Sequence, residues 1–243
     1  EQSLSRSTEA TLSVLGITNP ALRKHLTNIM MSECGSEGAF LAPPVFEQTF
    51  GWQESNISMQ ELVSQKKLLS KEIVDSLDLH QHGRYRFGAD WYPFTHQLNS
   101  WQSLLEKKNS VIVTSGTGSG KTECFMVPVL EDLYREYKEN GDKPLVGVRA
   151  LFLYPLNALI NSQRERLNAW TQSFDKNIRY CLYNGNTEEF HAKVRSDQAK
   201  KPNEILSRQL MREEPAPILV TNGTMLEYMM VRQIDAPILQ KSR

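Results

Sequence analysis

The chain has 243 residues, of which 40% are hydrophobic and 23% are charged, as is ordinary for a globular protein. No stretch approaches the roughly 20 apolar residues that a membrane-spanning helix needs, and the first ten residues lack the apolar region of a signal peptide, so we expect a cytoplasmic protein without a membrane partner. Lysines plus arginines and aspartates plus glutamates number 28 each, so the net charge is zero and a domain-wide basic footprint for nucleic acid is excluded.

Cysteine and histidine spacing gives no sign of a metal site. Cys34, Cys124 and Cys181 are widely separated and form no CxxC pair, so we expect reduced thiols rather than zinc ligands or a disulfide framework. His80 and His82 are close in sequence but have no third ligand nearby, and we interpret them as part of a solvated turn.

Residues 1–90 are predicted to form a helical N-terminal attachment. Short helices are expected near the start of the chain, with breaks near Gly16 and Pro20. Residues 38–52 are predicted to be a loop, because Pro43 and Pro44 prevent a helix there. Two further helices are expected, from Ser58 to about Ser70 and from about Lys71 to Leu79.

Residues 91–243 are predicted to form an α/β domain, because short apolar runs alternate with helical patterns and so favour a parallel sheet. The first strand expected is Ser110–Thr114 (SVIVT), a β-branched apolar run typical of a buried strand. Later strands are expected at 146–154, 178–183 and 217–220. Helices are expected at 121–137, 155–170, 203–213 and 222–231.

A glycine-rich segment, SGTGSGKT, follows the first predicted strand and opens the next predicted helix. It matches the P-loop pattern G-x-x-x-x-G-K-[ST] except that a serine replaces the first glycine. The glycines let backbone N–H groups form an anion cradle, and the following helix directs its N-terminus at the phosphates. We therefore predict an ATP site comprising Ser115, Gly116, Thr117, Gly118, Ser119, Gly120, Lys121 and Thr122.

Two residues of this segment carry the expected chemistry. Lys121 is predicted to pair with the β- and γ-phosphates of ATP, and the Thr122 hydroxyl is predicted to bind Mg²⁺. The alternative is a flexible loop with an incidental lysine. The coincidence of strand, glycines, Lys-Thr and helix favours the nucleotide site.

The segment from Trp91 through the P-loop resembles the opening of superfamily 2 DExH/D-box helicases, with a first RecA-like lobe. The resemblance implies that Gln97 reads the adenine edge, since a glutamine amide offers one donor and one acceptor. Tyr92 or Phe94 could stack on the base. The alternative for these aromatic residues is a core role.

Two later segments resemble the helicase motifs Ia and Ib. In LFLYPLNALINSQRERL, the resemblance implies phosphate contacts near Pro155, Asn157 and Asn161. Arg164 and Arg166 in the same segment are interpreted as solvated charges.

The second segment, PAPILVTNGTMLEYMMVR, implies contacts at Thr221, Asn222 and Thr224. An N-cap without a ligand is the alternative there. A weaker signal is the run 183–187, where the family has another strand-end loop.

The region that resembles these helicases covers roughly residues 91–232. Its sequence resembles in particular the large bacterial anti-phage defence helicases of the Druantia and DISARM type. No DExH or DEAD sequence occurs in the chain, so the carboxylates that hold Mg²⁺ are expected elsewhere. We therefore expect an incomplete RecA-like parallel sheet without its Walker B strand, and the N-terminal part of a larger motor that is inactive alone.

The leading hypothesis is an ATP-dependent helicase or translocase acting on nucleic acid, most simply DNA. Its partners would be the remaining part of the motor and defence-system subunits. A nucleotide-binding sensor or scaffold without motor activity is the alternative. A phosphotransferase fits poorly, because it leaves the helicase-like segments unexplained.

Overall fold

The computed structural model describes residues 2–43, 45, 51–116 and 118–242. The chain divides into two compact units, residues 1–51 and 52–243. This division lies well before residue 90, where the sequence suggested the end of the attachment. Residues 52–90 belong to the larger unit, so the limits of a separate RecA-like lobe stay a prediction.

The smaller unit contains a helical hairpin. Helices α1 (Gln2–Val14) and α2 (Pro20–Met30) are joined by a turn, and the side chain of Asn19 caps α2 by accepting from the N–H groups of Ala21 and Leu22. Arg23 pairs with Glu9 across the hairpin. Only Thr8 and Leu12 are buried in these two helices, so the hairpin has very little core of its own.

The larger unit begins with a helical layer formed by α3 (Met59–Ser64), α4 (Lys71–Leu77), η1 (His80–Tyr85) and α5 (Thr95–Leu105). Helix α6 (Lys121–Glu139) holds this layer through Glu131, a fully buried carboxylate. Glu131 accepts from the N–H and hydroxyl of Ser70, at 2.7 and 2.8 Å, and pairs with Arg135. Charge-assisted bonds of this kind are about twice as strong as neutral ones, which explains why residues 52–90 are integral to this unit.

A parallel sheet lies in the second half of the unit, with strand order β1-β4-β2-β3. Its strands are β1 (Ala150–Leu153), β2 (Tyr180–Leu182), β3 (Glu204–Ile205) and β4 (Ile218–Thr221). The helices between and after them are α7 (Asn157–Ser162), α8 (Arg164–Thr171), η2 (Gln172–Phe174), α9 (His191–Lys200), α10 (Arg208–Glu213), α11 (Gly223–Val231), η3 (Gln233–Asp235) and α12 (Ala236–Gln240).

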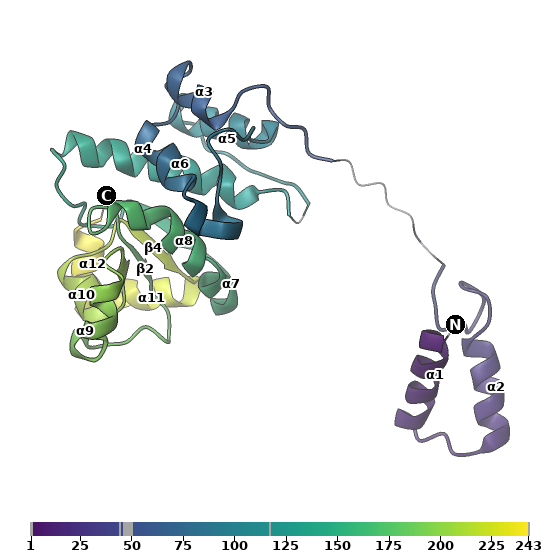
Figure 1. Cartoon of the computed structure of the whole chain (residues 1–243). Coiled ribbons are helices and arrows are strands. Elements are labelled where there is room, and N and C mark those ends of the chain that lie inside the picture. The colour runs from purple at the N-terminus through teal and green to yellow at the C-terminus, as the bar shows by residue number, and fades with distance from the viewer. Residues whose placement is uncertain (1, 44, 46–50, 117, 243) are drawn as a thin grey trace. The chain divides into compact units, whose positions relative to one another are not determined.

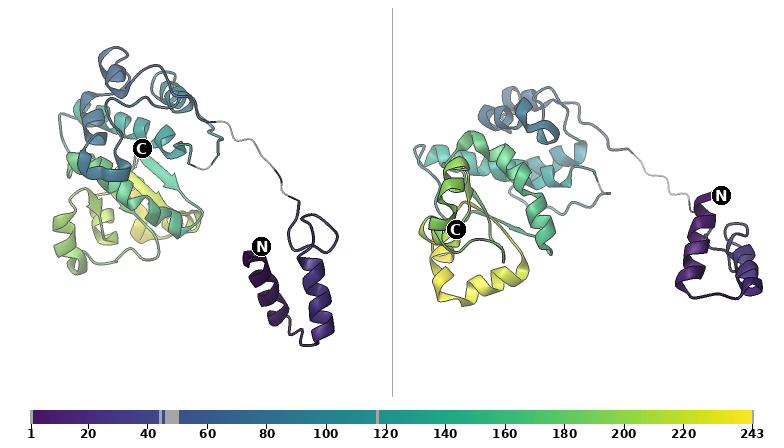
Figure 2. Two further views of the ribbon diagram at one scale, coloured as in Figure 1. Left: turned by 45° about the vertical axis from the view of Figure 1, so that its right-hand side comes forward. Right: turned by 60° about the horizontal axis from the view of Figure 1, so that its bottom comes forward.

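The sheet separates two apolar clusters, as strand alternation requires. On one face, Ile218 and Val220 of β4 join the large cluster that includes α5, α6 and α8. On the other face, Leu219 joins a smaller cluster with residues of α10, α11 and α12. The views in Figures 1 and 2 show this layered arrangement. The predicted α/β class with a parallel sheet and preceding helices is confirmed.

Two element predictions were wrong. Residues 110–114 form no strand, although the backbone there is not helical, and Ile112 is 91% exposed. A β-branched apolar run indicates a tendency to be buried in a sheet, but a strand also needs a neighbouring strand to which it can hydrogen-bond. In the described part of the chain, β1 pairs only with β4 and not with residues 110–114. The predicted helix at 203–213 begins instead with the short strand β3 and becomes helical only at Arg208.

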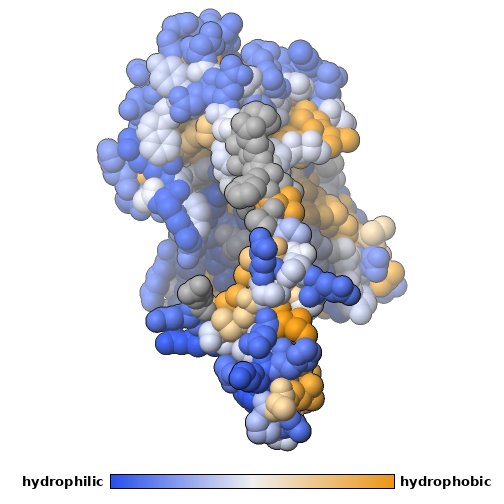
Figure 3. Space-filling model, turned by 90° about the vertical axis from the view of Figure 1, so that its right-hand side faces the viewer, coloured by the Kyte–Doolittle hydropathy of each residue, from blue (hydrophilic) through white to orange (hydrophobic). Residues whose placement is uncertain are grey.

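One face of β1 carries exposed apolar side chains, since Leu151 and Leu153 are 41% and 51% exposed. Figure 3 shows that apolar residues also reach the surface on the side of the molecule drawn there. Two adjoining cavities of about 340 and 450 Å³ are each bordered by Leu104 and Phe125; the smaller one reaches Ala150 of β1, and the larger one reaches Val111 and Val113. An unpaired strand with apolar neighbours is a site for pairing with a further strand.

Candidate nucleotide site and nucleic-acid face

The glycine-rich segment forms a loop that ends at the first turn of α6. Gly118 and Gly120 have φ values of +82° and +74°, a region that costs other residues roughly 1–2 kcal/mol. Gly120 is the N-cap of α6, so the loop delivers the chain directly into a helix N-terminus, where phosphates bind favourably. Thr117, which was predicted to belong to the site, lies outside the described residues.

Lys121 is folded back onto this loop. Its Nζ donates to the backbone carbonyls of Ser115, at 2.8 Å, and Gly116, at 2.6 Å. The Ser115 and Ser119 hydroxyls are also hydrogen-bonded to each other. A bound triphosphate would take the lysine from these two carbonyls, since a phosphate oxygen is the stronger partner for an ammonium group.

Helix α5 holds the loop from the other side. His96 Nε2 lies 2.8 Å from the carbonyl of Ser119, and Gln97 Nε2 donates to the carbonyl of Gly120 at 3.1 Å. Gln97 Oε1 accepts from the N–H of Phe94 at 2.9 Å. Gln97 is only 2% exposed, so both ends of its amide are engaged within the protein.

A cavity of about 530 Å³ lies beside the loop and contains the residues expected around a base. It is lined by Trp91, Tyr92, Phe94, Gln97, Gly118 and Gly120, among others. Trp91 and Tyr92 are 44% and 50% exposed, and Phe94 stacks on the His96 ring. The structure thus brings the predicted glutamine, the predicted aromatic residues and the P-loop glycines to one cavity.

One ion pair at this site was not predicted from the sequence. Arg166, expected as a solvated charge, donates to Glu123 Oε1 at 2.6 Å, and the two side chains are 22% and 16% exposed. Arg164 pairs with Glu204, which is 1% exposed. Burial raises the pKa of Tyr154, while the positive charge of Arg166 acts in the opposite direction. Arg164 is exposed as expected although it is paired, whereas Arg166 was misjudged because helical periodicity does not reveal which carboxylate another element supplies.

Thr122 lies at the opposite side of the loop, in the first turn of α6. Together with Lys121 and Tyr154 it borders the 450 Å³ cavity that reaches Val111 and Val113. A hydroxyl at the start of a P-loop helix is a hard oxygen donor of the kind that Mg²⁺ prefers. Among the described residues, no group of three or more histidine, cysteine or acidic side chains could hold a metal.

The residues predicted to contact nucleic acid lie where parallel strands end. Asn157 opens α7 shortly after β1, and Asn222 caps α11 directly after β4. Asn222 Nδ2 donates to Asn157 Oδ1 at 2.8 Å, and Asn222 Oδ1 accepts from the N–H of Met225 at 2.8 Å. Two segments 65 residues apart in sequence are therefore joined side by side.

The other predicted contacts differ in exposure. Pro155, Asn161 and Thr224 are exposed near the same strand ends. Thr221, however, is fully buried, and its hydroxyl donates to the carbonyl of Tyr183 at 2.6 Å. The structure therefore does not bring the Thr221 hydroxyl to the surface that the other residues share. The sheet uses this hydroxyl to join β4 to the end of β2.

The third strand-end segment, residues 183–187, forms a compact turn. The N–H of Asn186 donates to Asn184 Oδ1 at 2.8 Å, and the N–H of Asn184 donates to Thr187 Oγ1 at 2.9 Å. A polar cavity of about 450 Å³ lies next to this turn and is also bordered by Asn161 and Arg164. The polar surface thus continues from the ends of β1 and β4 to the end of β2.

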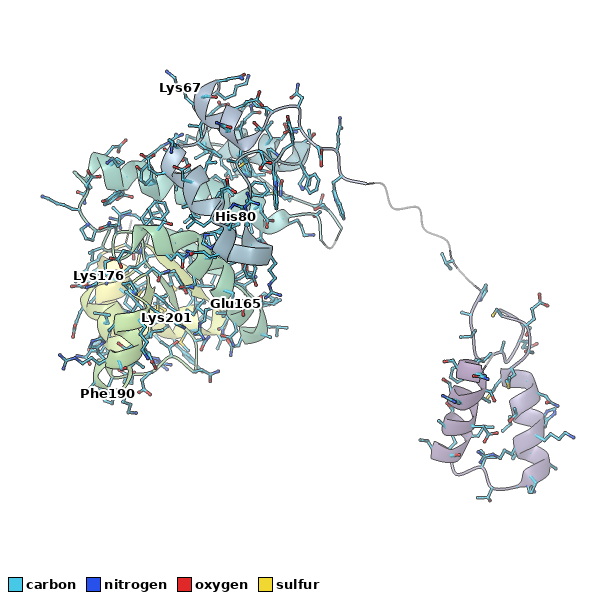
Figure 4. All side chains as sticks on the ribbon, in the orientation of Figure 1. Lys67, His80, Glu165, Lys176, Phe190 and Lys201 are labelled. Atoms are coloured by element: carbon cyan, nitrogen blue, oxygen red, sulfur yellow. The ribbon has the colours of Figure 1, made fainter. Side chains whose placement is uncertain are left out.

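The histidine pair is not a solvated turn as expected. His82 is buried, with its Nε2 2.8 Å from the carbonyl of Ser76, whereas His80 is exposed on η1 (Figure 4). The three cysteines are free, and burial is the main reason that the pKa of the Cys124 thiol is raised. None of the helices in the described residues is both long and apolar enough to cross a membrane.

A glycine-rich loop at the N-terminus of a helix, beside a parallel α/β sheet with polar residues at its strand ends, defines a P-loop nucleotide-binding domain of the RecA-like type. Residues 94–241 match the DEAD/DEAH box helicase family. This match covers more than half of the 243 residues. The chain belongs to that family.

Individual relatives are more distant. The Druantia protein DruE of Escherichia coli (strain UMEA 4076-1) is 24% identical over 234 residues, covering 62% of this chain and 13% of DruE. The uncharacterized ATP-dependent helicase YprA of Bacillus subtilis (strain 168) is 31% identical over 94 residues, covering 39% of this chain and 11% of YprA.

The crystal structure of the DUF1998 helicase MrfA bound to DNA shares the fold. Its TM-score is 0.51 and its sequence identity is 23%, and the similarity covers 73% of this chain and 20% of MrfA. The chain thus spans only a small part of the length of these relatives.

Proposed function

We propose that this chain is the nucleotide-binding part of an ATP-dependent helicase or translocase that acts on nucleic acid. The observation that carries the proposal is the joining of the two functional surfaces in one unit. The P-loop opens α6, and the Asn157–Asn222 pair lies at the ends of β1 and β4 in the same unit. Membership of the DEAD/DEAH box helicase family supports both assignments.

ATP with Mg²⁺ is the proposed cofactor. Lys121 would bind the β- and γ-phosphates and Thr122 would contribute an oxygen ligand to Mg²⁺. The base would occupy the cavity beside Gln97, with Tyr92 or Phe94 available for stacking. Each amide atom of Gln97 has one partner and keeps one further N–H or lone pair, so direct reading of the adenine edge would require this buried side chain to become accessible to the base.

The proposed nucleic-acid contacts are Asn157, Asn161, Asn222 and Thr224, with the backbone after Pro155. Amide side chains and helix N-termini bind phosphates without reading sequence, which suits a protein that moves along a strand. DNA is the proposed substrate, supported by the likeness in fold to MrfA, whose structure contains DNA. The similarity to DruE supports a place in a bacterial anti-phage defence system.

The two cavities bordered by Leu104 and Phe125 indicate where the rest of the catalytic centre belongs. The walls of both cavities are largely apolar; the larger one reaches Lys121 and Thr122, and the smaller one reaches Ala150 of β1, a strand that pairs only with β4 in the described part of the chain. We propose that further strands of the same motor fill this space and carry the carboxylates that hold Mg²⁺ and orient water. Without them this chain would bind ATP but not hydrolyse it.

ATP hydrolysis by the full-length protein tests this proposal. Single-stranded DNA should raise the rate of hydrolysis, and Asn157→Ala combined with Asn222→Ala should reduce that stimulation by about tenfold while leaving the DNA-independent rate within about twofold. Loss of two polar contacts at about 0.7 kcal/mol each gives a change of this size. A rate of ATP hydrolysis that changes with neither DNA nor RNA would favour the sensor or scaffold function instead.

A further inference from the structure

The carboxylate of Glu123 has two different surroundings. Its Oε1 is bonded to Arg166, while its Oε2 is buried and has no hydrogen-bond partner among the described residues. A methyl group added at Gly120 would lie 3.2 Å from Oε2, so this oxygen lies directly against the P-loop. A shift of the loop at Gly120 would therefore move or strain the Glu123 side chain.

Phosphate binding would change the contacts that hold the loop. Lys121 is held by the carbonyls of Ser115 and Gly116, and Gly120 is held by Gln97. A phosphate that takes the lysine also adds negative charge at the N-terminus of α6, where Glu123 is already negative. A loop that rearranges when the anion binds would provide the two-state element that coupling between sites requires.

Arg166 connects Glu123 to the helices that carry the nucleic-acid contacts. It lies in α8, and its guanidinium is 5.5 Å from the ring centre of Tyr85 and 5.6 Å from that of Trp170. Gln163 ends α7 and begins α8, so a displacement of α8 is passed to α7, with Asn157 and Asn161. Glu165, next to Arg166 in sequence, is labelled on the same helix in Figure 4.

We propose that Arg166 is a positioning residue that couples nucleotide binding at the P-loop to nucleic-acid binding at α7. It holds Glu123 against the loop on one side and fixes α8 on the other. The pair is mostly buried, so it is screened less by salt than an exposed pair would be. This inference rests on the proposed function and adds a route by which each ligand changes the affinity for the other, as linkage requires.

The test measures how far one ligand changes the affinity for the other. The dissociation constant of this chain for a fluorescent single-stranded DNA is measured by anisotropy, with and without saturating Mg²⁺ and a non-hydrolysable ATP analogue. The two constants of the wild type should differ by about fivefold or more, as is typical of coupled sites. In Arg166→Met the ratio should fall below about twofold, while the affinity for each ligand alone stays within about threefold.

The control is a second ion pair made by helix α6. Arg149, just before β1, donates to Glu136 near the far end of α6 at 2.9 Å, and the side chains are 14% and 27% exposed. Arg149→Met removes a pair of similar burial that does not touch the P-loop, so it should keep the wild-type ratio. A merely structural role for Arg166 predicts that both variants behave alike.

Glu123→Gln is the second variant, since it removes the charge without changing the volume. It should lower the ratio of the two DNA dissociation constants as Arg166→Met does. In the double variant this ratio should be no lower than in either single variant, because both substitutions remove the same ion pair. A ratio near one in the wild type, or a ratio equal to that of the wild type in either single variant, would overturn this inference but leave the proposed function standing. Failure of the wild type to bind the analogue or DNA would contradict the proposed function and this inference with it.

Discussion

Single residues of the P-loop show how far chemistry can be predicted without a structure. The roles proposed for Lys121 and Thr122 rest on their place in the motif, and both residues lie in the first turn of α6. The bond of Gln97 to Gly120 could not be predicted, because it depends on how closely α5 approaches the loop. Sequence spacing gives no such distance.

Gly120 should be the least replaceable glycine of the loop. In Gly120→Ala, the added Cβ would collide with Gln97 Nε2 at a φ of +74°, so we expect a cost of about 1–2 kcal/mol from the backbone alone. The melting temperature should then fall by roughly 3–8 °C, and the affinity for ATP should fall with it. Gly116→Ala is the matched control, because a Cβ there meets nothing within 4 Å. Equal melting temperatures for both variants would show that this packing is absent in solution.

Secondary-structure elements were predicted best where a helix has both a start signal and an apolar face. Helix α6 begins at Lys121 as expected and continues two residues beyond the predicted Tyr137. The predicted helix at 155–170 is divided at Gln163 into α7 and α8. The run at 110–114 failed as a strand because its pattern indicates burial, whereas a strand also needs a hydrogen-bonded neighbour.

The cap of α11 allows its structural and binding roles to be separated. Asn222→Ala should cost about 1 kcal/mol by removing the N-cap, which lowers the melting temperature by roughly 2–4 °C. Asn222→Ser keeps a capping oxygen but loses the amide that bonds Asn157. The serine variant should therefore keep its melting temperature and bind single-stranded DNA several-fold more weakly. If the serine variant binds DNA as tightly as the wild type, Asn222 serves only as the N-cap of α11 and does not contribute to DNA binding.

For the chain as a whole, the class of the fold predicted from the sequence is confirmed, while the predicted division into two domains stays a prediction. Charge and composition excluded a basic surface over the whole chain, and the proposed nucleic-acid face is correspondingly local and built from amides. The boundary expected at residue 90 differs from the division after Gly51. Buried contacts such as that of Glu131 with Ser70 cause this difference, and they link residues that are 61 positions apart.

Nucleotide binding at the P-loop is the central property proposed for this chain. Titration of this chain with a fluorescent ATP analogue and Mg²⁺ should give saturable binding that unlabelled ATP displaces. Lys121→Ala should weaken it by at least about tenfold, because a charged hydrogen-bond donor contributes about 1.5–3 kcal/mol. Saturable binding of equal affinity in wild type and Lys121→Ala would contradict the assignment of the site.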